Sequence, residues 1–315
     1  MLSAKETYRQ FCDTSSRPLI FQTPLWLDAV AGDENWNVIL SFKGTLLVGA
    51  MPYVTNSKLG LKQITLPFLT PYLGPIIIYP TDLKKDNYHS HDRKVTSDLV
   101  AQIPKTDRFI TQTDFEYMYW SPFAWAGYSQ TTRYSYLLDT SKTEEELLKG
   151  FKPNIKKHIR NSGATYAVIA ANEIDPVFNL HQNDLKNKGI ELLFTQNQFA
   201  RLDQTVSTSG KRIILHAIDD SGNIVCAFYL VFDHQYMHYL VGAVTDDARN
   251  SGVMSLLMWE AIKESKKRGL TFNFEGSMNK NIDRFFSSFG GTLSPYMQIS
   301  KTGNKWLKQF TRFNH

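Results

Sequence analysis

The sequence has few cysteines, no long apolar run and no strong excess of charge of either sign. Of its 315 residues only Cys12 and Cys226 are cysteines, and without a Cys-x-x-Cys pair they indicate a reducing compartment rather than a disulfide framework. No apolar stretch approaches the ~20 residues that a membrane-spanning helix requires, and Met1 to Glu6 lack the apolar core of a signal peptide. We therefore expect a soluble, cytoplasmic protein with no membrane span.

Several motifs of common enzymes are also missing. The sequence has no Walker loop, no dinucleotide fingerprint and no Gly-x-Ser-x-Gly elbow. His89, His91, His234 and His238 have neither cysteines beside them nor a His-Glu-x-x-His pattern, so we predict no metal site and no tightly bound cofactor. The formal net charge of +5 permits an anionic ligand but does not predict DNA binding.

What is present indicates a two-domain protein of mixed α/β class. Hydrophobic residues make up 42% of the chain and aromatic residues 13%, which suits extensive internal sheet. A length of 315 residues suggests about two domains. Strand and helix signals do not alternate as in a doubly wound sheet, so we expect each domain to hold a mixed sheet of its own.

Hydrophobic periodicity, caps and turn residues predict the individual elements. Helices are expected at 23–30, within 82–102, at 141–161 with a break at Pro153, at 175–187, 196–207 and 252–268, and through Phe285 and Phe286. Strands are expected at 36–42, 45–54, 108–113, 134–138, 165–170, 211–218, 224–232, 236–241, 271–274 and 292–299. Three prolines make the apolar segment 66–79 irregular or an edge.

A basic stripe is the first candidate site. Lys149, Lys152, Lys156 and Arg160 recur at three- and four-residue spacing, so they share one helical face. A phosphate or carboxylate ligand would relieve their mutual repulsion. The alternative is a solvated face whose charges are balanced by the acidic residues 144–146.

The second candidate is the segment 246–254, between a strand and a long helix. Backbone amides at a helix start form a ready anion site. The spacing Arg249-x-x-Gly252 resembles the pyrophosphate loop of GNAT acyltransferases, although Met254 occupies the last position of that pattern, where a small residue is usual. The alternative is an ordinary helix cap by Asn250 or Ser251.

The third candidate is a carboxylate at the end of a strand. Glu275 follows the strand 271–274 and precedes Gly276, a place where functional residues are common. It could accept a proton from an attacking amine or anchor a substrate amide. The alternatives are that it caps the next helix or pairs with the basic stripe.

Five segments between 131 and 295 resemble the FemABX family of peptidoglycan aminoacyl transferases and its relatives with a GNAT-like acetyltransferase domain. They are Tyr134–Asp139, Lys152–Arg160, Tyr239–Ala243 with Leu256–Ile262, Gly269–Gly276, and Phe285-x-x-x-Phe289-Gly290. The sequence departs from the family at Phe286, where a lysine is usual; the nearest cation is Arg284. The long helical hairpin that some members insert for transfer RNA has no counterpart here between residues 174 and 209.

The resemblance implies two tandem GNAT-like domains, at 1–130 and 131–295, with residues 296–315 packing back on the first. It implies an acyl or aminoacyl transferase with acyl-coenzyme A or aminoacyl-tRNA as donor substrate and a small or nucleotide-sugar-type anionic substrate, in cell-wall or cell-surface biosynthesis. The sequence does not indicate the oligomeric state.

We assign the expected roles as follows. Glu275 orients or deprotonates the amine and Tyr239 donates to the oxyanion; Lys152, Lys156, Arg160, Trp120 and Asn279 bind substrate; Arg249 and Gly252 bind a phosphate group of the donor. Trp120 belongs to the aromatic cluster 115–125, which could line a cleft or pack between domains. The assignment expects the basic stripe, the Arg249 turn and the Glu275 corner to converge on one hollow. Two alternatives stay open: a coenzyme A-dependent N-acetyltransferase of a small or sugar amine, and a non-catalytic binding protein on a degenerate scaffold.

Overall fold

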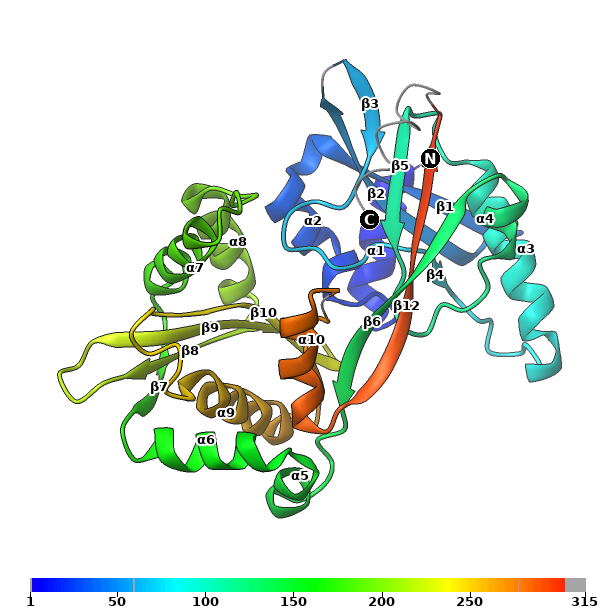
Figure 1. Cartoon of the computed structure of the whole chain (residues 1–315). Helices are drawn as coiled ribbons and strands as arrows, with labels where there is room; N and C mark the ends of the chain where they lie inside the picture. Colours follow the sequence, from blue (N-terminus) through cyan, green and yellow to red (C-terminus); the bar gives the residue numbers. More distant parts are fainter. Residues whose placement is uncertain (1, 59, 277, 304–315) are drawn as a thin grey trace. The chain divides into compact units, whose positions relative to one another are not determined.

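The structure is a computed structural model that describes residues 2–58, 60–276 and 278–303. The chain divides into two compact units, one running to Arg133 and resuming at Pro295, the other spanning Tyr134–Ser294 (Figure 1). The domains predicted from the sequence are residues 1–130 and residues 131–295. Of the predicted returning segment, residues 296–302 lie in the last strand of the chain and 304–315 lie outside the described residues.

The first unit has a mixed sheet with short helices around it. Its helices and strands are α1 (Ala4–Thr14), α2 (Pro24–Ala31), β1 (Trp36–Lys43), β2 (Leu46–Lys58), β3 (Leu61–Ile64), β4 (Ile76–Ile77), α3 (Tyr88–Ala101), β5 (Arg108–Gln112), α4 (Ser121–Trp125) and most of β12 (Thr292–Thr302). The strand order is β1-β2-β3-β5-β12, with β4 paired to β2. The predicted hairpin at Lys43-Gly44 joins β1 to β2, and the proline-rich segment 66–79 forms only the short β4.

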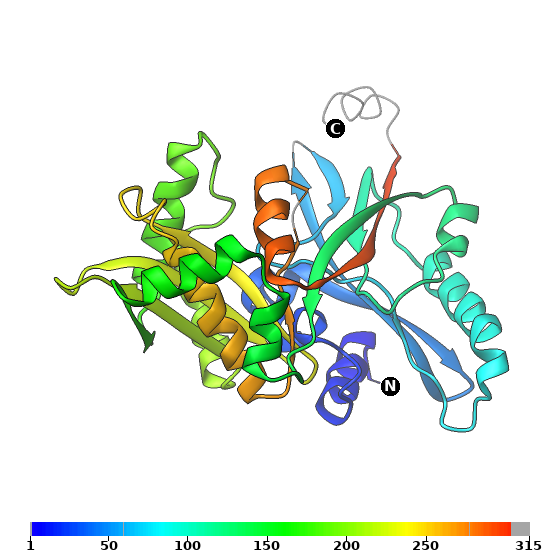
Figure 2. The same cartoon turned by 60° about the horizontal axis from the view of Figure 1, so that its bottom comes forward.

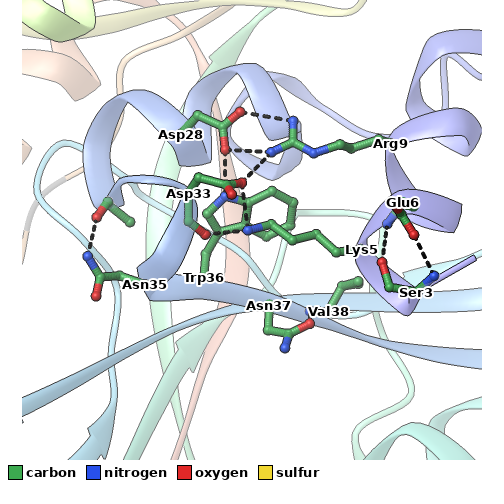
Figure 3. A network of polar contacts seen from close by, with 11 residues as sticks. Ser3, Lys5, Glu6, Arg9, Asp28, Asp33, Asn35, Trp36, Asn37 and Val38 are labelled. Atoms are coloured by element: carbon green, nitrogen blue, oxygen red, sulfur yellow. Dashed lines mark hydrogen bonds and ion pairs between the residues drawn. The ribbon is translucent and has the colours of Figure 1, made fainter.

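Helix α1 has no counterpart among the predicted elements. Its first turn is closed by a capping box, in which Ser3 Oγ accepts from the Glu6 amide at 3.2 Å and Glu6 Oε2 accepts from the Ser3 amide at 2.7 Å (Figure 3). The buried Tyr8 hydroxyl donates to the Gln22 carbonyl at 2.9 Å. The Ser-x-x-Glu spacing is therefore the sequence signal for this helix.

A network of charges holds α1 against α2 and β1 (Figure 3). Arg9 donates to both carboxylate oxygens of Asp28, at 2.9 and 2.8 Å, and Trp36 Nε1 donates to Asp28 Oδ1 at 2.7 Å. Lys5 and Arg9 both pair with Asp33, and both cations lie over the Trp36 ring. Asp28 is thus the acceptor that joins all three elements.

The second unit has a twisted sheet covered on both faces. Its elements are β6 (Ser129–Leu138, entering from the first unit), α5 (Glu144–Gly150), α6 (Pro153–Gly163), β7 (Ala167–Ala171), α7 (Asp175–Asn187), α8 (Gln196–Thr208), β8 (Arg212–Ile218), β9 (Ile224–Phe232), β10 (Tyr236–Val244), α9 (Val253–Lys267), β11 (Thr271–Asn273) and α10 (Lys280–Phe286). The strand order is β6-β11-β10-β9-β8-β7. Among the described residues of this unit, β10 pairs with β11 in parallel and the remaining strand pairs are antiparallel.

Side chains alternate between the two faces of this sheet, as strand geometry requires. Phe228 on β9, Met237 on β10 and Phe272 on β11 belong to the main apolar core with α5, α6 and α9. Tyr229 points to the other face, where its ring lies 5.0 Å from that of Phe199 on α8. Figure 1 shows α7 and α8 on one side of the sheet and α9 on the other, and Figure 2 shows α6 crossing α9. His238 and Asn273, the next residues along, therefore lie on the α7 and α8 face.

We predict that Asp28→Ala lowers the unfolding free energy by about 1–3 kcal/mol, because it removes the shared acceptor of Arg9 and Trp36. Chemical denaturation followed by tryptophan fluorescence measures the change. Glu34→Ala is the matched control: Glu34 is exposed, in the same neighbourhood, and forms no ion pair within the described residues. Equal stability of the two variants would contradict the importance of this network.

Candidate active site

A buried histidine between two carboxylates forms the centre of the site. His238 on β10 is fully buried; its Nδ1 lies 2.5 Å from Glu275 Oε1 and its Nε2 lies 3.5 Å from Asp233 Oδ2. Asp233, in the turn between β9 and β10, also accepts from the backbone amides of Gln235 and Tyr236, each at 2.8 Å. The three ionisable groups thus come from the β9–β10 turn, β10 and the end of β11.

The side chain of Asn273 completes the network around Glu275. Its Nδ2 donates to Glu275 Oε1 at 3.0 Å, and its Oδ1 accepts from the Glu275 amide at 2.9 Å and from the Ser135 hydroxyl at 2.7 Å. Ser135 Oγ in turn accepts from the Gly276 amide at 3.0 Å. Glu275 has a positive φ of 53°, a conformation that costs a non-glycine residue of order 1–3 kcal/mol and that these contacts stabilise.

The two carboxylates change the protonation of the histidine. Burial by itself lowers the pKa of His238, but hydrogen bonds and charge from Asp233 and Glu275 outweigh it and raise that pKa to about 9. Burial would raise the pKa of Asp233, yet the hydrogen bond and charge of His238 lower it to about 2. At neutral pH the histidine is therefore an imidazolium that faces two carboxylates.

Gly276 allows the chain to turn away directly after Glu275. A Cβ at this position would lie 2.0 Å from the Tyr134 carbonyl oxygen and 2.5 Å from the Ser135 Cα, both backbone atoms of β6. No side chain fits without moving β6. The close approach of the two backbones is what brings Ser135 to the Glu275 corner.

The two parallel strands separate at the site. β10 pairs with β11 only from Tyr236 to His238, and His238 stands opposite Asn273. β10 continues to Val244 and pairs with β9 on its other side, with a bulge between Tyr239 and Val241. In the part of the chain that the structure describes, no strand pairs with the β11 side of residues 239–244. Backbone hydrogen-bonding groups are thus available beside the Glu275 corner.

The basic stripe does not meet Glu275. Ile155 of α6 packs in the core on the α9 face, and Lys152, Lys156 and Arg160 are exposed on that side. The Glu275 carboxylate contacts His238 and Asn273, which lie on the opposite face. The expected convergence of the stripe with the Glu275 corner is wrong, because strand alternation puts the sheet between them. The alternative of a solvated face fits their exposure, but within the described residues the acidic residues 144–146 form an ion pair with Lys149 and with none of these three cations.

The Arg249 turn is occupied by the protein's own groups. Arg249 pairs with Asp184 of α7 at 3.0 Å and with Asp246 at 2.6 Å. Gly252, at φ 87°, is the residue that caps α9, where Asn250 or Ser251 was the predicted alternative. A Cβ on Gly252 would lie 2.8 Å from the His158 Cβ of α6. β10 continues for six residues beyond His238, which stands opposite Asn273, before the chain reaches this turn.

Tyr239 and Phe286 belong to the apolar face. The Tyr239 ring packs edge-on against Phe228 and Phe286, at centroid distances of 4.7 and 5.8 Å, and its hydroxyl lies beside Gly242. The structure therefore does not bring Tyr239 to the Glu275 carboxylate. Phe286, where the FemABX resemblance expects a lysine, is a buried core residue, and Arg284 is exposed.

The remaining predicted residues have identifiable structural contacts. Asn279 caps α10, with Oδ1 accepting from the Asn281 amide at 2.9 Å. Trp120 lies in the first unit, packed against that unit's core, and its carbonyl accepts from the Phe123 amide at 2.9 Å. Tyr117, from the same aromatic cluster, is buried in that core. Substrate binding by Asn279 and Trp120 stays a prediction.

Asp233, His238, Asn273 and Ser135 were not predicted as site residues. His238 was considered only as a metal ligand; within the described residues no group of three or more His, Cys, Asp or Glu side chains is arranged to hold a metal ion. The available signal was polar residues inside apolar strands: His238 and Asn273 interrupt β10 and β11. A buried polar side chain must find a partner.

A separate hollow of about 840 Å³ lies between α7, α8 and their connection. Its lining includes the side-chain amides of Asn179, Gln182 and Asn183 on α7 and several apolar residues, among them Phe178 and Phe194. None of the predicted site residues lines it. Among the helices that the structure describes, none combines the length and the hydrophobicity that a membrane span requires.

Comparison with known proteins supports the GNAT resemblance. Residues 149–278 match a family model described as an acetyltransferase (GNAT) domain, and no curated protein matches the chain. The chain is similar to the crystal structure of FemX, at 13% identity over 98% of both chains and a TM-score of 0.68. It is also similar to the C-terminal domain of a putative lysylphosphatidylglycerol synthetase from Agrobacterium fabrum (13%, 99% and 96% covered, TM-score 0.56). A tandem GNAT protein from the clavulanic acid biosynthesis pathway matches at 10% identity, 94% and 93% coverage and a TM-score of 0.50.

Residues 149–278 therefore match the GNAT acetyltransferase domain, and acyltransferase is the class of enzyme that this match supports. Nearly its whole length has the fold of FemX, which confirms the predicted mixed α/β class and the FemABX-like, GNAT-like architecture.

We predict that stability depends on pH through the Asp233–His238 pair. His238 stabilises the fold fully below its ordinary pKa of 6.5, and this contribution, on the order of 3 kcal/mol, is lost as pH rises through about 9. Asp233 stabilises the fold above its ordinary pKa of 3.8, and this contribution is lost as pH falls through about 2. Urea denaturation from pH 6 to 10 measures the alkaline limb. A flat curve over this range would show that His238 is not protonated at neutral pH.

We also predict that Gly276→Ala destabilises the protein by about 2 kcal/mol or more, because the added methyl would overlap the β6 backbone. Gly150→Ala is the matched control: nothing lies within 4 Å of its Cβ position, and alanine favours the helix. Differential scanning calorimetry of both variants should show a lower Tm for Gly276→Ala only.

Proposed function

We propose that this protein transfers an acyl or aminoacyl group from an activated donor to an amine, with Glu275 binding the acceptor amine. The observation that carries the proposal is the position of Glu275, an anchored carboxylate at the point where β10 and β11 separate. Its Oε1 accepts two hydrogen bonds, while its Oε2 has no partner within the described residues. A carboxylate oxygen so placed can hold an ammonium group or accept an amine proton.

The open side of β10 supports a donor that carries amide groups. Residues 239–244 offer peptide N–H and C=O groups to a ligand lying alongside, as a strand would. Acyl-coenzyme A has two amides in its pantetheine arm and fits this requirement. The donor phosphates are harder to accommodate at the predicted loop, because Arg249 is already paired twice and α6 packs on Gly252. Both acyl-coenzyme A and aminoacyl-tRNA therefore remain donors to be tested.

The reaction balances as R′C(O)X + RNH₃⁺ → R′C(O)NHR + HX + H⁺. The ammonium first loses one proton, and the amine nitrogen then attacks the donor carbonyl carbon. A C–N bond forms, the C–S bond of a thioester or the C–O bond of an ester breaks, and the leaving group takes up a proton. Holding the amine at Glu275 beside the donor on β10 supplies the proximity on which such a transfer depends.

Further features support the setting of the reaction. Cys12 and Cys226 are both free thiols, which supports a reducing compartment, the cytoplasm. The FemABX resemblance suggests acceptors from cell-wall or cell-surface biosynthesis. The replacement of the family lysine by the buried Phe286 favours the alternative of a non-catalytic binding protein, so the test must detect binding and turnover separately.

We predict that Glu275→Gln lowers acyl transfer at least about 100-fold, because the amide cannot accept a proton or hold an ammonium group by charge. The assay offers acetyl-coenzyme A or a mixture of aminoacylated tRNAs as donor and lysine-containing peptides or amino sugars as acceptor. Glu144→Gln, an exposed carboxylate with no ion pair in the described part of the chain, should keep wild-type activity.

Binding is followed in parallel as the shift in Tm on addition of each donor. A Tm shift without product would favour the binding-protein alternative. Full activity of Glu275→Gln would overturn the role given to this residue.

A further inference from the structure

We infer that Asp233 and His238 are positioning residues that hold the Glu275 carboxylate in one orientation, so that Oε2 forms a fixed anionic acceptor for a primary ammonium group. The inference rests on the proposed function, in which Glu275 binds the acceptor amine. It adds the substrate class, a cationic primary amine, and two residues that do not touch the substrate.

The first step of the argument is how completely Glu275 is held. His238 Nδ1 and Asn273 Nδ2 both bind Oε1, and the Glu275 amide binds Asn273 Oδ1. The side chain is only 14% exposed, and its backbone is in the left-handed region. A flexible surface glutamate would show none of these features. The strain at φ 53° persists because the surrounding contacts determine the position of this residue.

The second step is how His238 itself is held. Its ring is fully buried, and each ring nitrogen faces a different carboxylate. A neutral imidazole has one N–H and can donate to only one of them, whereas an imidazolium donates to both. Asp233 is tied to the β9–β10 turn by the amides of Gln235 and Tyr236. The turn thus fixes Asp233, Asp233 fixes the orientation of the imidazole, and the imidazole fixes the Glu275 carboxylate.

The third step is the charge of the group. Two carboxylates and one imidazolium carry a net charge of −1; among the described residues, the charged groups that act on His238 are Asp233 and Glu275. The Tyr236 ring, 5.8 Å away, is the aromatic neighbour. Within the described residues this leaves one net negative charge beside Oε2, which suits a monocation. An imidazolium cannot accept a further proton, so the pair does not relay a proton inward from Glu275, and the ammonium proton leaves through Oε2 to solvent.

A substrate-free experiment tests the anchoring directly. The full-length protein is labelled with ¹⁵N-histidine, and the His238 ring nitrogens are followed by NMR from pH 6 to 10, assigned with His238→Gln. We expect both nitrogens to remain protonated at pH 7 in the wild type, and Asp233→Asn to lower the midpoint of the titration. His234→Gln, which changes an exposed histidine in the same turn, should leave the signal unchanged. A neutral His238 at pH 7 would overturn the inference without affecting the role of Glu275.

A kinetic experiment separates positioning from catalysis. With the acceptor that gives turnover, Asp233→Asn should raise the KM for the amine about tenfold or more and move the alkaline limb of kcat/KM to lower pH. His238→Gln should have the same effects if this variant folds. If His238→Gln does not fold, Asp233→Asn still tests the inference, because asparagine keeps the shape and the hydrogen-bonding groups of the side chain. If Asp233→Asn keeps the wild-type KM and pH profile while Glu275→Gln is inactive, the positioning role of Asp233 and His238 is refuted and the role of Glu275 is not. Activity in Glu275→Gln would refute the proposed function instead.

Discussion

A buried imidazolium between two carboxylates is the interaction on which the rest of the site depends. None of the three groups is stable in the interior alone, because an unpaired buried charge costs several kcal/mol. Together they join the β9–β10 turn, β10 and the end of β11 through one cluster of charged side chains. Asn273 and Ser135 connect this cluster to β6. The local strain at Glu275 is tolerated because so many contacts act on it.

The sheet of the second unit separates two chemically different faces. On one, α9 and α6 bury an aromatic core in which Phe274 and Phe286 pack together, and the cations of α6 face solvent. On the other, polar side chains of β10 and β11 meet at Glu275. The separation of the two strands gives the polar face access to the free edge of β10.

Most secondary structure of the second unit followed from the sequence, because its signals are local. β9 was predicted at its observed bounds, and Gly269 ends α9 with the positive φ that favours glycine there. The Ser3-x-x-Glu6 capping box of α1 was an equally local signal that was not used. Glu275 could be predicted as a site residue because it follows a strand and precedes a glycine. The partners of Glu275 could not be predicted, because they depend on which residue of β10 lies opposite Asn273.

The sequence by itself determined the class of fold, the positions of most helices and strands, and Glu275 as a candidate for chemistry. Periodicity, caps and turns carry that information within a few residues. Only the tertiary structure decided that Lys156 and Arg160 lie across the sheet from Glu275 and that His238 is its partner. The physical reason is register: shifting a strand by one residue turns every side chain to the other face, and the register of β10 against β11 is set by contacts between residues more than thirty positions apart.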